Sequence, residues 1–217
     1  SVYVGGYSTG SSGTGTYIIS AGDLTAGTTL YVGDGGGTGY LTQTGGVVTA
    51  GRVIIGDDAG SVGTYNLTDA ALDMTGVPAN QMAIGNGGTG VLNQSGGSVI
   101  NGSTTVRDFA LGAAATAYGE YNLSNGGTFT FTGTNMRVGD VGTGIFNMSG
   151  SDSLIQGQGG NEILHISESG GYGELNITSG TIDGFNSVYL ATETGGGTGK
   201  LNLDDGLISL SGHLVVG

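Results

Sequence analysis

The sequence predicts an all-β protein: a right-handed parallel β-helix, or β-solenoid, of about eight coils with roughly 26 residues each. Three observations support this fold. An apolar–x–apolar–Gly segment recurs along the chain, two further strand-like segments follow each recurrence, and Gly-rich turns separate the three. Each coil therefore holds three short strands. Because the pattern runs through the whole sequence, we expect a single solenoid domain over residues 1–217, without evident caps.

The composition fits such a solenoid and excludes several other classes of protein. Gly occurs 50 times among 217 residues, but a single Pro and the lack of a three-residue period exclude collagen. Apolar residues make up 36% of the chain and recur in short runs, which argues against disorder. The formal net charge of −13, with only four Lys and Arg residues, argues against a nucleic-acid partner. No apolar run is long enough for a membrane span, and the absence of Cys excludes disulfides.

The apolar–x–apolar–Gly segment predicts the first strand of each coil. Its first residue recurs at intervals of 23 to 29 residues, which defines eight full periods. These anchor residues are Val2, Leu30, Val53, Met82, Phe109, Met136, Leu164, Val188 and Leu214. Ser167 and Ala191 replace the anchor Gly in two late coils.

The second strand is predicted where Thr and Gly precede an alternation of apolar and polar residues. Alternation with a period of two indicates a strand with one buried face. The first inward residues are Tyr17, Leu41, Tyr65, Leu92, Tyr121, Phe146, Leu175 and Leu201. Two residues later come Ile19, Gln43, Leu67, Gln94, Leu123, Met148, Ile177 and Leu203.

The third strand follows the second at a nearly constant distance. Gly pairs such as Gly45–Gly46 allow the tight turn that this spacing requires, because Gly adopts positive φ without steric cost. Its inward residues are predicted to be Leu24, Val48, Leu72, Val99, Phe129, Leu154, Ile182 and Ile208. The longest connections, around 73–81, 100–108 and 155–163, are expected to project from one corner as a candidate binding surface.

A row of asparagines lies at one outward position of the second strand. We interpret it as a structural ladder in which amides of stacked coils hydrogen-bond to one another. Its members are Asn66, Asn93, Asn122, Asn147, Asn176 and Asn202. Five of them also begin formal glycosylation sequons, but glycans on adjacent rungs would collide. Asn101, expected in a longer loop, is the better candidate for glycosylation.

Acidic and amide residues follow the anchor Gly in several coils, at Asp34, Asp57, Asn86 and Asp140. Stacked side chains of this kind suggest a possible Ca²⁺ site, since Ca²⁺ takes six to eight oxygen ligands. The alternative is a purely conformational role, because Asp and Asn after Gly favour turns. No other cofactor is expected.

The sequence gives little support for catalysis, and we expect the protein not to be an enzyme. Arg137 and His165 occupy equivalent outward positions of consecutive coils, with Glu168 and Glu174 nearby. This group is the most plausible place for acid–base chemistry, but the favoured interpretation is an ordinary solvated face. Outward Tyr3, Tyr31 and Tyr189 could stack on sugars or contribute to an interface.

The repeats resemble the Gly/Thr-rich β-strand repeats of autotransporter-type passenger domains and related secreted bacterial surface proteins. The resemblance rests on segments such as VGDGGGTGYLTQTGG (32–46), IGNGGTGVLNQSGG (84–97) and VGDVGTGIFNMSG (138–150). It implies a right-handed parallel β-helix that is exported to the cell surface or matrix. It transfers no catalytic residue, because such repeats are scaffolds.

Both ends of the sequence stop within a first-strand segment, SVYVGG at one end and HLVVG at the other. No capping element precedes or follows them, so we expect either a piece of a longer solenoid or copies that stack head to tail. The sequence thus favours a structural protein of an extracellular filament, matrix or surface layer. The alternative is a glycan-binding adhesin or a polysaccharide-acting passenger domain on the same scaffold.

Overall fold

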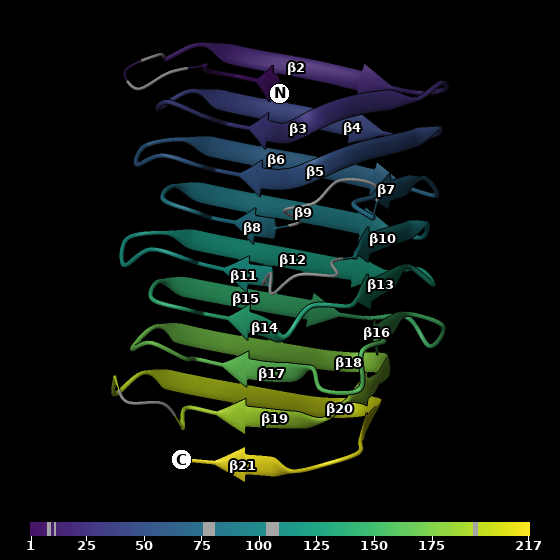
Figure 1. Cartoon of the computed structure of the whole chain (residues 1–217), viewed down its shortest axis with the longest axis vertical. Coiled ribbons are helices and arrows are strands. Elements are labelled where there is room, and N and C mark those ends of the chain that lie inside the picture. The colour runs from purple at the N-terminus through teal and green to yellow at the C-terminus, as the bar shows by residue number, and fades with distance from the viewer. Residues whose placement is uncertain (8–9, 11, 76–80, 103–108, 193–194) are drawn as a thin grey trace.

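The computed structural model describes residues 1–7, 10, 12–75, 81–102, 109–192 and 195–217. It shows a parallel β-solenoid of about eight turns, in which the chain descends from the first coil to the last in a right-handed sense (Figure 1). The described residues contain strands and turns but no helix, so no helix among them could cross a membrane. Every strand pairing is parallel.

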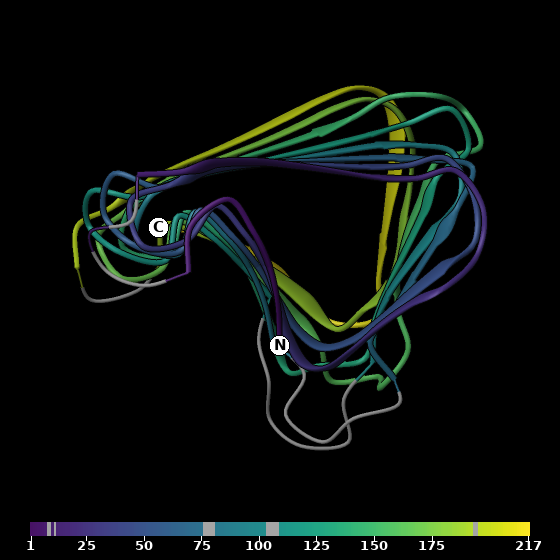
Figure 2. The same ribbon diagram turned by 90° about the horizontal axis from the view of Figure 1, so that it is seen from above.

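Three faces enclose the core, and seen along the axis they form a triangle that narrows at one corner (Figure 2). Face 1 is made by β1 (Val2–Val4), the second halves of β3 (Leu24–Val32) and β5 (Val47–Ile55), β8 (Gln81–Ile84), β11 (Phe109–Leu111), β14 (Asn135–Val138), β17 (Ile163–Ile166), β19 (Ser187–Leu190) and β21 (Leu214–Val216). Face 2 is made by β2 (Thr14–Ile19), β4 (Thr38–Gln43), β6 (Val62–Thr68), β9 (Thr89–Ser95), β12 (Tyr118–Ser124), β15 (Thr143–Met148) and the first halves of β18 (Tyr172–Phe185) and β20 (Thr198–Leu210). Face 3 is made by the first halves of β3 and β5, β7 (Ala71–Asp73), β10 (Ser98–Asn101), β13 (Thr128–Phe131), β16 (Leu154–Gly157) and the second halves of β18 and β20.

The strand register places like residues directly over one another, as the repeat predicts. On face 1, Val2 aligns with Leu30 and Leu30 with Val53, and this column continues through the remaining anchors to Leu214. On face 2, Tyr121 aligns with Leu92 in the coil before it and with Phe146 in the coil after it. The predicted inward columns of faces 1 and 2 are therefore confirmed.

One predicted inward residue of face 3, Leu154, is wrong. Phe129 aligns with Ile155, which is fully buried, whereas Leu154 aligns with Thr128 and is only half-buried. The run Ser153-Leu154-Ile155 offers two adjacent apolar residues, and a shift of one residue moves a side chain to the opposite face of a strand.

Glycine columns line the narrow corner where face 1 turns into face 2. A Cβ on Gly39 would lie 2.0 Å from the Val4 carbonyl oxygen, and one on Gly63 would lie 1.9 Å from that of Val32. The anchor Gly is constrained in the same way, since a Cβ on Gly85 would meet the Tyr118 carbonyl oxygen at 2.1 Å. Backbone packs directly on backbone here, so no side chain fits.

The core also holds two buried glutamines, Gln43 and Gln94, at inward positions of face 2. Tyr65 donates its hydroxyl hydrogen bond to Gln43 Oε1 at 2.5 Å, and the Gln43 amide donates to the carbonyl oxygens of Gly46 and Ala71. Two coils later, Tyr121 and Gln94 repeat this arrangement. Each glutamine thus satisfies its polar atoms internally, as buried amides must.

The outer side of face 1 is less exposed than the alternation predicts. Ile54, Ala83, Ala110 and His165 all point away from the core, yet all four are buried. Parts of the predicted projecting connections, 76–80 and 103–108, lie outside the described residues. Face 2 therefore carries the most regular described outer surface.

Candidate functional site

The outer surface of face 2 carries a continuous ladder of asparagine amides. Each Nδ2 donates to the Oδ1 of the asparagine one coil earlier, over distances between 2.5 and 2.9 Å. Five such bonds join Asn66, Asn93, Asn122, Asn147, Asn176 and Asn202 in order. In-register parallel strands hold identical residues one strand spacing apart, and this distance suits an amide-to-amide hydrogen bond. All six amides consequently point in the same direction along the solenoid.

Beside the ladder, Tyr118, Glu120 and Asn122 form a hydrogen-bonded unit on β12. The Tyr118 hydroxyl donates to Glu120 Oε2 at 2.6 Å, and Asn122 Nδ2 donates to Glu120 Oε1 at 2.9 Å. The three residues alternate along the strand and so share its outward side. Partial burial, together with the hydrogen bond and charge of Glu120, raises the pKa of Tyr118 to about 12.

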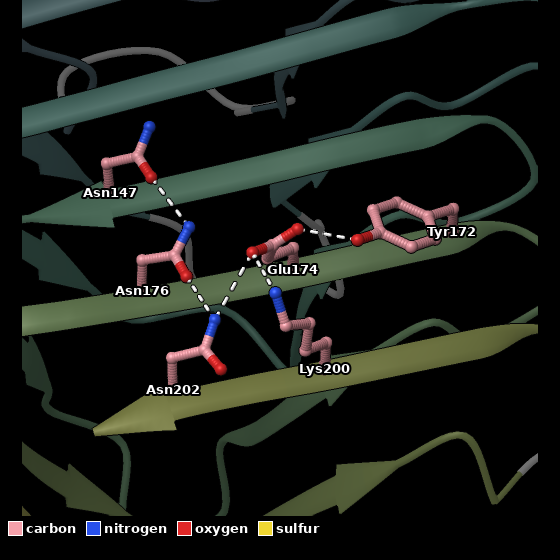
Figure 3. A network of polar contacts seen from close by, with 6 residues as sticks. All are labelled: Asn147, Tyr172, Glu174, Asn176, Lys200 and Asn202. Carbon is pink, nitrogen blue, oxygen red and sulfur yellow. Dashed lines mark hydrogen bonds and ion pairs between the residues drawn. The ribbon is translucent and has the colours of Figure 1, made fainter. Parts of the chain in front are cut away.

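A similar unit recurs two coils later on β18, with Tyr172, Glu174 and Asn176 in equivalent positions, but here the amide that donates to Glu174 Oε1 is that of Asn202 in the next coil, at 3.2 Å (Figure 3). Tyr172 donates to Glu174 Oε2 at 2.5 Å, and Lys200 Nζ lies 2.9 Å from Glu174 Oε1. The hydrogen bonds from Tyr172 and Lys200 lower the pKa of Glu174, and the carboxylate raises the pKa of Lys200. The unit is thus held with an ionised carboxylate and a protonated ammonium.

One coil separates the two units, and it presents small or apolar side chains in the same columns. Thr143 lies between the two tyrosines, and Ile145 lies between the two glutamates. Asn147 continues the ladder through this coil. Sequence analysis found the ladder but missed Tyr118, Glu120 and Tyr172. The repeated Tyr-Gly-Glu-x-Asn segments, YGEYN (118–122) and YGELN (172–176), were the signal.

The residues proposed to bind Ca²⁺ do not converge on a common point. Asn86 Nδ2 donates to Asp57 Oδ1 at 2.6 Å, while Asp34 Oδ1 accepts from the Gly35 backbone at 2.8 Å. Asp140 lies two coils beyond Asn86, with Ala113 at the equivalent position between them. Within the described ranges, no group of three His, Cys, Asp or Glu residues is placed to hold a metal ion. Burial is the largest cause of the raised pKa of Asp34, and the nearby Asp57 and Asp58 add to it.

Asn101, the candidate glycosylation residue, is the last residue of β10 and not part of an exposed loop. Its side chain is 2% exposed, and its Nδ2 makes no hydrogen bond within the described part of the chain. Glycosylation at Asn101 stays a prediction, and this burial argues against it, since a transferase needs an accessible amide.

Arg137, His165 and Glu168 do come together on the outer side of face 1. Arg137 Nε forms an ion pair with Glu168, and His165 Nδ1 lies 3.9 Å from Glu168 Oε1. His165 Nε2 lies 3.3 Å from Asn135 Oδ1, and its ring meets that of Tyr189 edge-on at 5.5 Å. His165 is buried, so this is a packed structural cluster and not the solvated face that the sequence favoured. Glu174 lies apart from it, on face 2.

Comparisons with protein families, with curated proteins and with solved structures return no match for this chain.

Proposed function

We propose that this chain is a structural, non-enzymatic unit of an extracellular filament, matrix or surface layer, whose solenoid ends join head to tail. The observation that carries this proposal is that inward residues of the first and last described coils are exposed, so a further coil, of this protein or of a second copy, would cover them. Leu203, an inward residue of the last coil, is 49% exposed, whereas Leu67 in the same column is fully buried. Tyr17, in the first coil, is also exposed, although its column neighbour Leu41 is buried.

The two ends present strand edges of the same phase. If β2 of a second copy followed β20, Gly15 would continue the column of Gly199, Tyr17 that of Leu201, and Ile19 that of Leu203. Unpaired strand edges readily pair with another chain. A head-to-tail contact of this kind does not close on itself, so it propagates into a filament.

Two further features support an extracellular scaffold. The net charge of −13, with few charged residues in total, makes the flanks acidic and polar, which favours solubility over lateral aggregation. The repeats also resemble those of autotransporter-type passenger domains, which are exported scaffolds.

Electron microscopy of the purified chain over a range of concentrations tests the proposal, together with sedimentation velocity. We expect rods that lengthen as the concentration rises. Leu203→Asp places a charge in the joint and should leave single rods, whereas Val62→Asp, on the outer side of face 2, should still assemble. Single rods of the unaltered chain at every concentration would contradict the proposal.

A further inference from the structure

We propose that the outer surface of face 2 binds an extended, neutral β-1,4-linked polysaccharide, which lies along the solenoid axis across Tyr118, Ile145 and Tyr172. This binding site does not overlap the head-to-tail joint, because Tyr118, Ile145 and Tyr172 lie on β12, β15 and β18, and β20 lies between Tyr172 and the exposed strand edge. The site consists of the two Tyr–Glu–Asn units and the coil between them.

The spacing of the two tyrosines fits this ligand. Tyr118 aligns with Thr143, and Thr143 aligns with Tyr172, so the two rings are two strand spacings apart. This separation is roughly 10 Å, close to one disaccharide in an extended β-1,4-linked chain. Successive sugars in such a chain are turned over relative to one another. Two rings one disaccharide apart therefore meet the same face of alternate sugars, and the coil between them, with Thr143 and Ile145, meets the intervening sugar.

The rings are held in an orientation suited to stacking. Each hydroxyl donates to a glutamate two residues further along the same strand, so each ring lies along its strand, as Figure 3 shows for Tyr172. Both tyrosines are partly exposed, and their neighbours in the column are the shorter side chains of Thr89, Thr143 and Thr198. A ring fixed before binding loses little conformational freedom when a sugar packs on it.

The asparagine ladder supplies polar contacts at the same spacing. Among the described residues, the amide nitrogen of Asn147 makes a single hydrogen bond, to Asn122, so its second N–H remains available. Each carboxamide oxygen of the ladder has two lone pairs, and a ladder bond uses one of them. The coil between the tyrosines thus offers a donor and an acceptor to sugar hydroxyls.

The charge of the site selects a neutral glycan. Glu120 and Glu174 place two carboxylates beside the rings, and the single cation among the described residues of the site, Lys200, is already paired with Glu174. An acidic polysaccharide would be repelled, whereas carboxylates accept hydrogen bonds from neutral sugar hydroxyls.

Calorimetric titration with cellohexaose, chitohexaose and xylohexaose tests the proposal, together with depletion of the protein by insoluble cellulose and chitin. We expect binding of at least one hexasaccharide, and much weaker binding of the corresponding disaccharide, which cannot span both rings. Tyr118→Ala and Tyr172→Ala should each weaken binding by about tenfold. Tyr31→Ala, on the outer side of face 1, should leave binding unchanged.

The role of the glutamate in positioning the ring is tested separately. Glu120→Ala should weaken binding, and Glu120→Gln, which keeps an acceptor for the Tyr118 hydroxyl, should restore most of it. The Leu203→Asp variant should bind as tightly as the unaltered chain, which separates this site from filament assembly. No binding to any of the three hexasaccharides, or binding that survives the Tyr118→Ala/Tyr172→Ala double substitution, would overturn the proposal. Dimerisation of the chain through face 2 would also overturn it.

Discussion

The two sides of face 2 use tyrosine in opposite ways. Inside the solenoid, Tyr121 donates to Gln94 of the preceding coil, and the pair is fully buried. Outside, Tyr118 donates to Glu120 of its own strand and stays partly exposed. The inner pair ties neighbouring coils together and satisfies all of its polar atoms. The outer pair fixes a ring within one coil and retains hydrogen-bonding capacity, so the inner side serves stability and the outer side carries the proposed glycan site.

Replacing a buried glutamine is expected to give the largest difference in stability between the inner and outer sides of face 2. Gln94→Leu leaves the buried Tyr121 hydroxyl without its acceptor and removes two amide hydrogen bonds, to the carbonyl oxygens of Gly97 and Thr128. An unsatisfied buried group costs about 1–3 kcal/mol and a lost hydrogen bond about 1 kcal/mol, so we expect a loss of roughly 3 kcal/mol in the free energy of unfolding. Denaturant unfolding measures it. Glu120→Leu on the outer side is the control, and an equal loss there would remove the distinction.

The pH dependence of stability should report the buried tyrosines, together with a contribution from Tyr118, whose pKa is raised to about 12. Burial raises the pKa of Tyr65 and of Tyr121 above the ordinary value of 10. Above pH 10 the unfolded chain releases protons that the folded chain retains, so stability is constant below that pH and falls above it. The slope should be about 1.4 kcal/mol per pH unit for each tyrosine. Urea midpoints between pH 9 and 12 measure this fall. The Tyr65→Phe/Tyr121→Phe variant should be less stable at pH 8 but should lose less stability on going to pH 12.

Removing a rung of the outer ladder should have a smaller effect. Asn147→Ala removes two amide hydrogen bonds, with Asn122 and with Asn176, whereas Asn66→Ala removes one. Because these side chains are partly exposed, we expect losses of about 1–2 and about 0.5–1 kcal/mol, respectively. Thermal unfolding of the two variants measures the ratio of these two losses in stability. Equal losses would mean that the amides contribute independently of their position in the ladder.

The smallest expected effect is a gain in stability. Ala191 occupies an anchor-glycine position with φ of +51°, a left-handed conformation that is costly for residues with a Cβ. Ala191→Gly should therefore stabilise the chain by up to about 1 kcal/mol, less the entropy that Gly gains in the unfolded state. Ser167→Gly offers a contrast, because it removes the same strain together with the hydrogen bond from Ser167 Oγ to the Gly171 carbonyl oxygen. A loss of stability in Ala191→Gly would contradict this account.

The fold was largely predictable because every coil places apolar residues at the same core-facing positions. Anchors such as Val53 and Met82 recur at the same phase, and the strand register aligns them as the spacing indicates. The wrong prediction at Leu154 has a local cause. Two adjacent residues, Leu154 and Ile155, are apolar, so the sequence does not show which of the two side chains faces the core. The burial of His165 was also not predictable, because alternation along a strand says nothing about what covers its outer side. Asn101 is buried for another reason, since it lies two residues after Val99 on the inward side of β10 and aligns with Phe131.

The candidate site was predictable only in part. The asparagine row was visible because six identical residues share one phase. The Tyr–Glu–Asn units were missed because each occurs in a single coil, and two occurrences stand out only when alternate coils are compared. The inner Tyr–Gln pairs were hidden for a related reason, since each pair joins residues from two different coils.

Disulfide formation along the asparagine ladder tests most directly whether like residues one coil apart form columns. The chain contains no cysteine, so an introduced pair has no competitor. Asn122→Cys/Asn147→Cys places two cysteines on adjacent rungs, where the Cα separation of neighbouring strands suits a disulfide. Asn122→Cys/Asn176→Cys places them two rungs apart, beyond the reach of a disulfide. We predict rapid oxidation of the first pair and no intramolecular bond in the second. Equal cross-linking of both pairs would contradict the stacked solenoid.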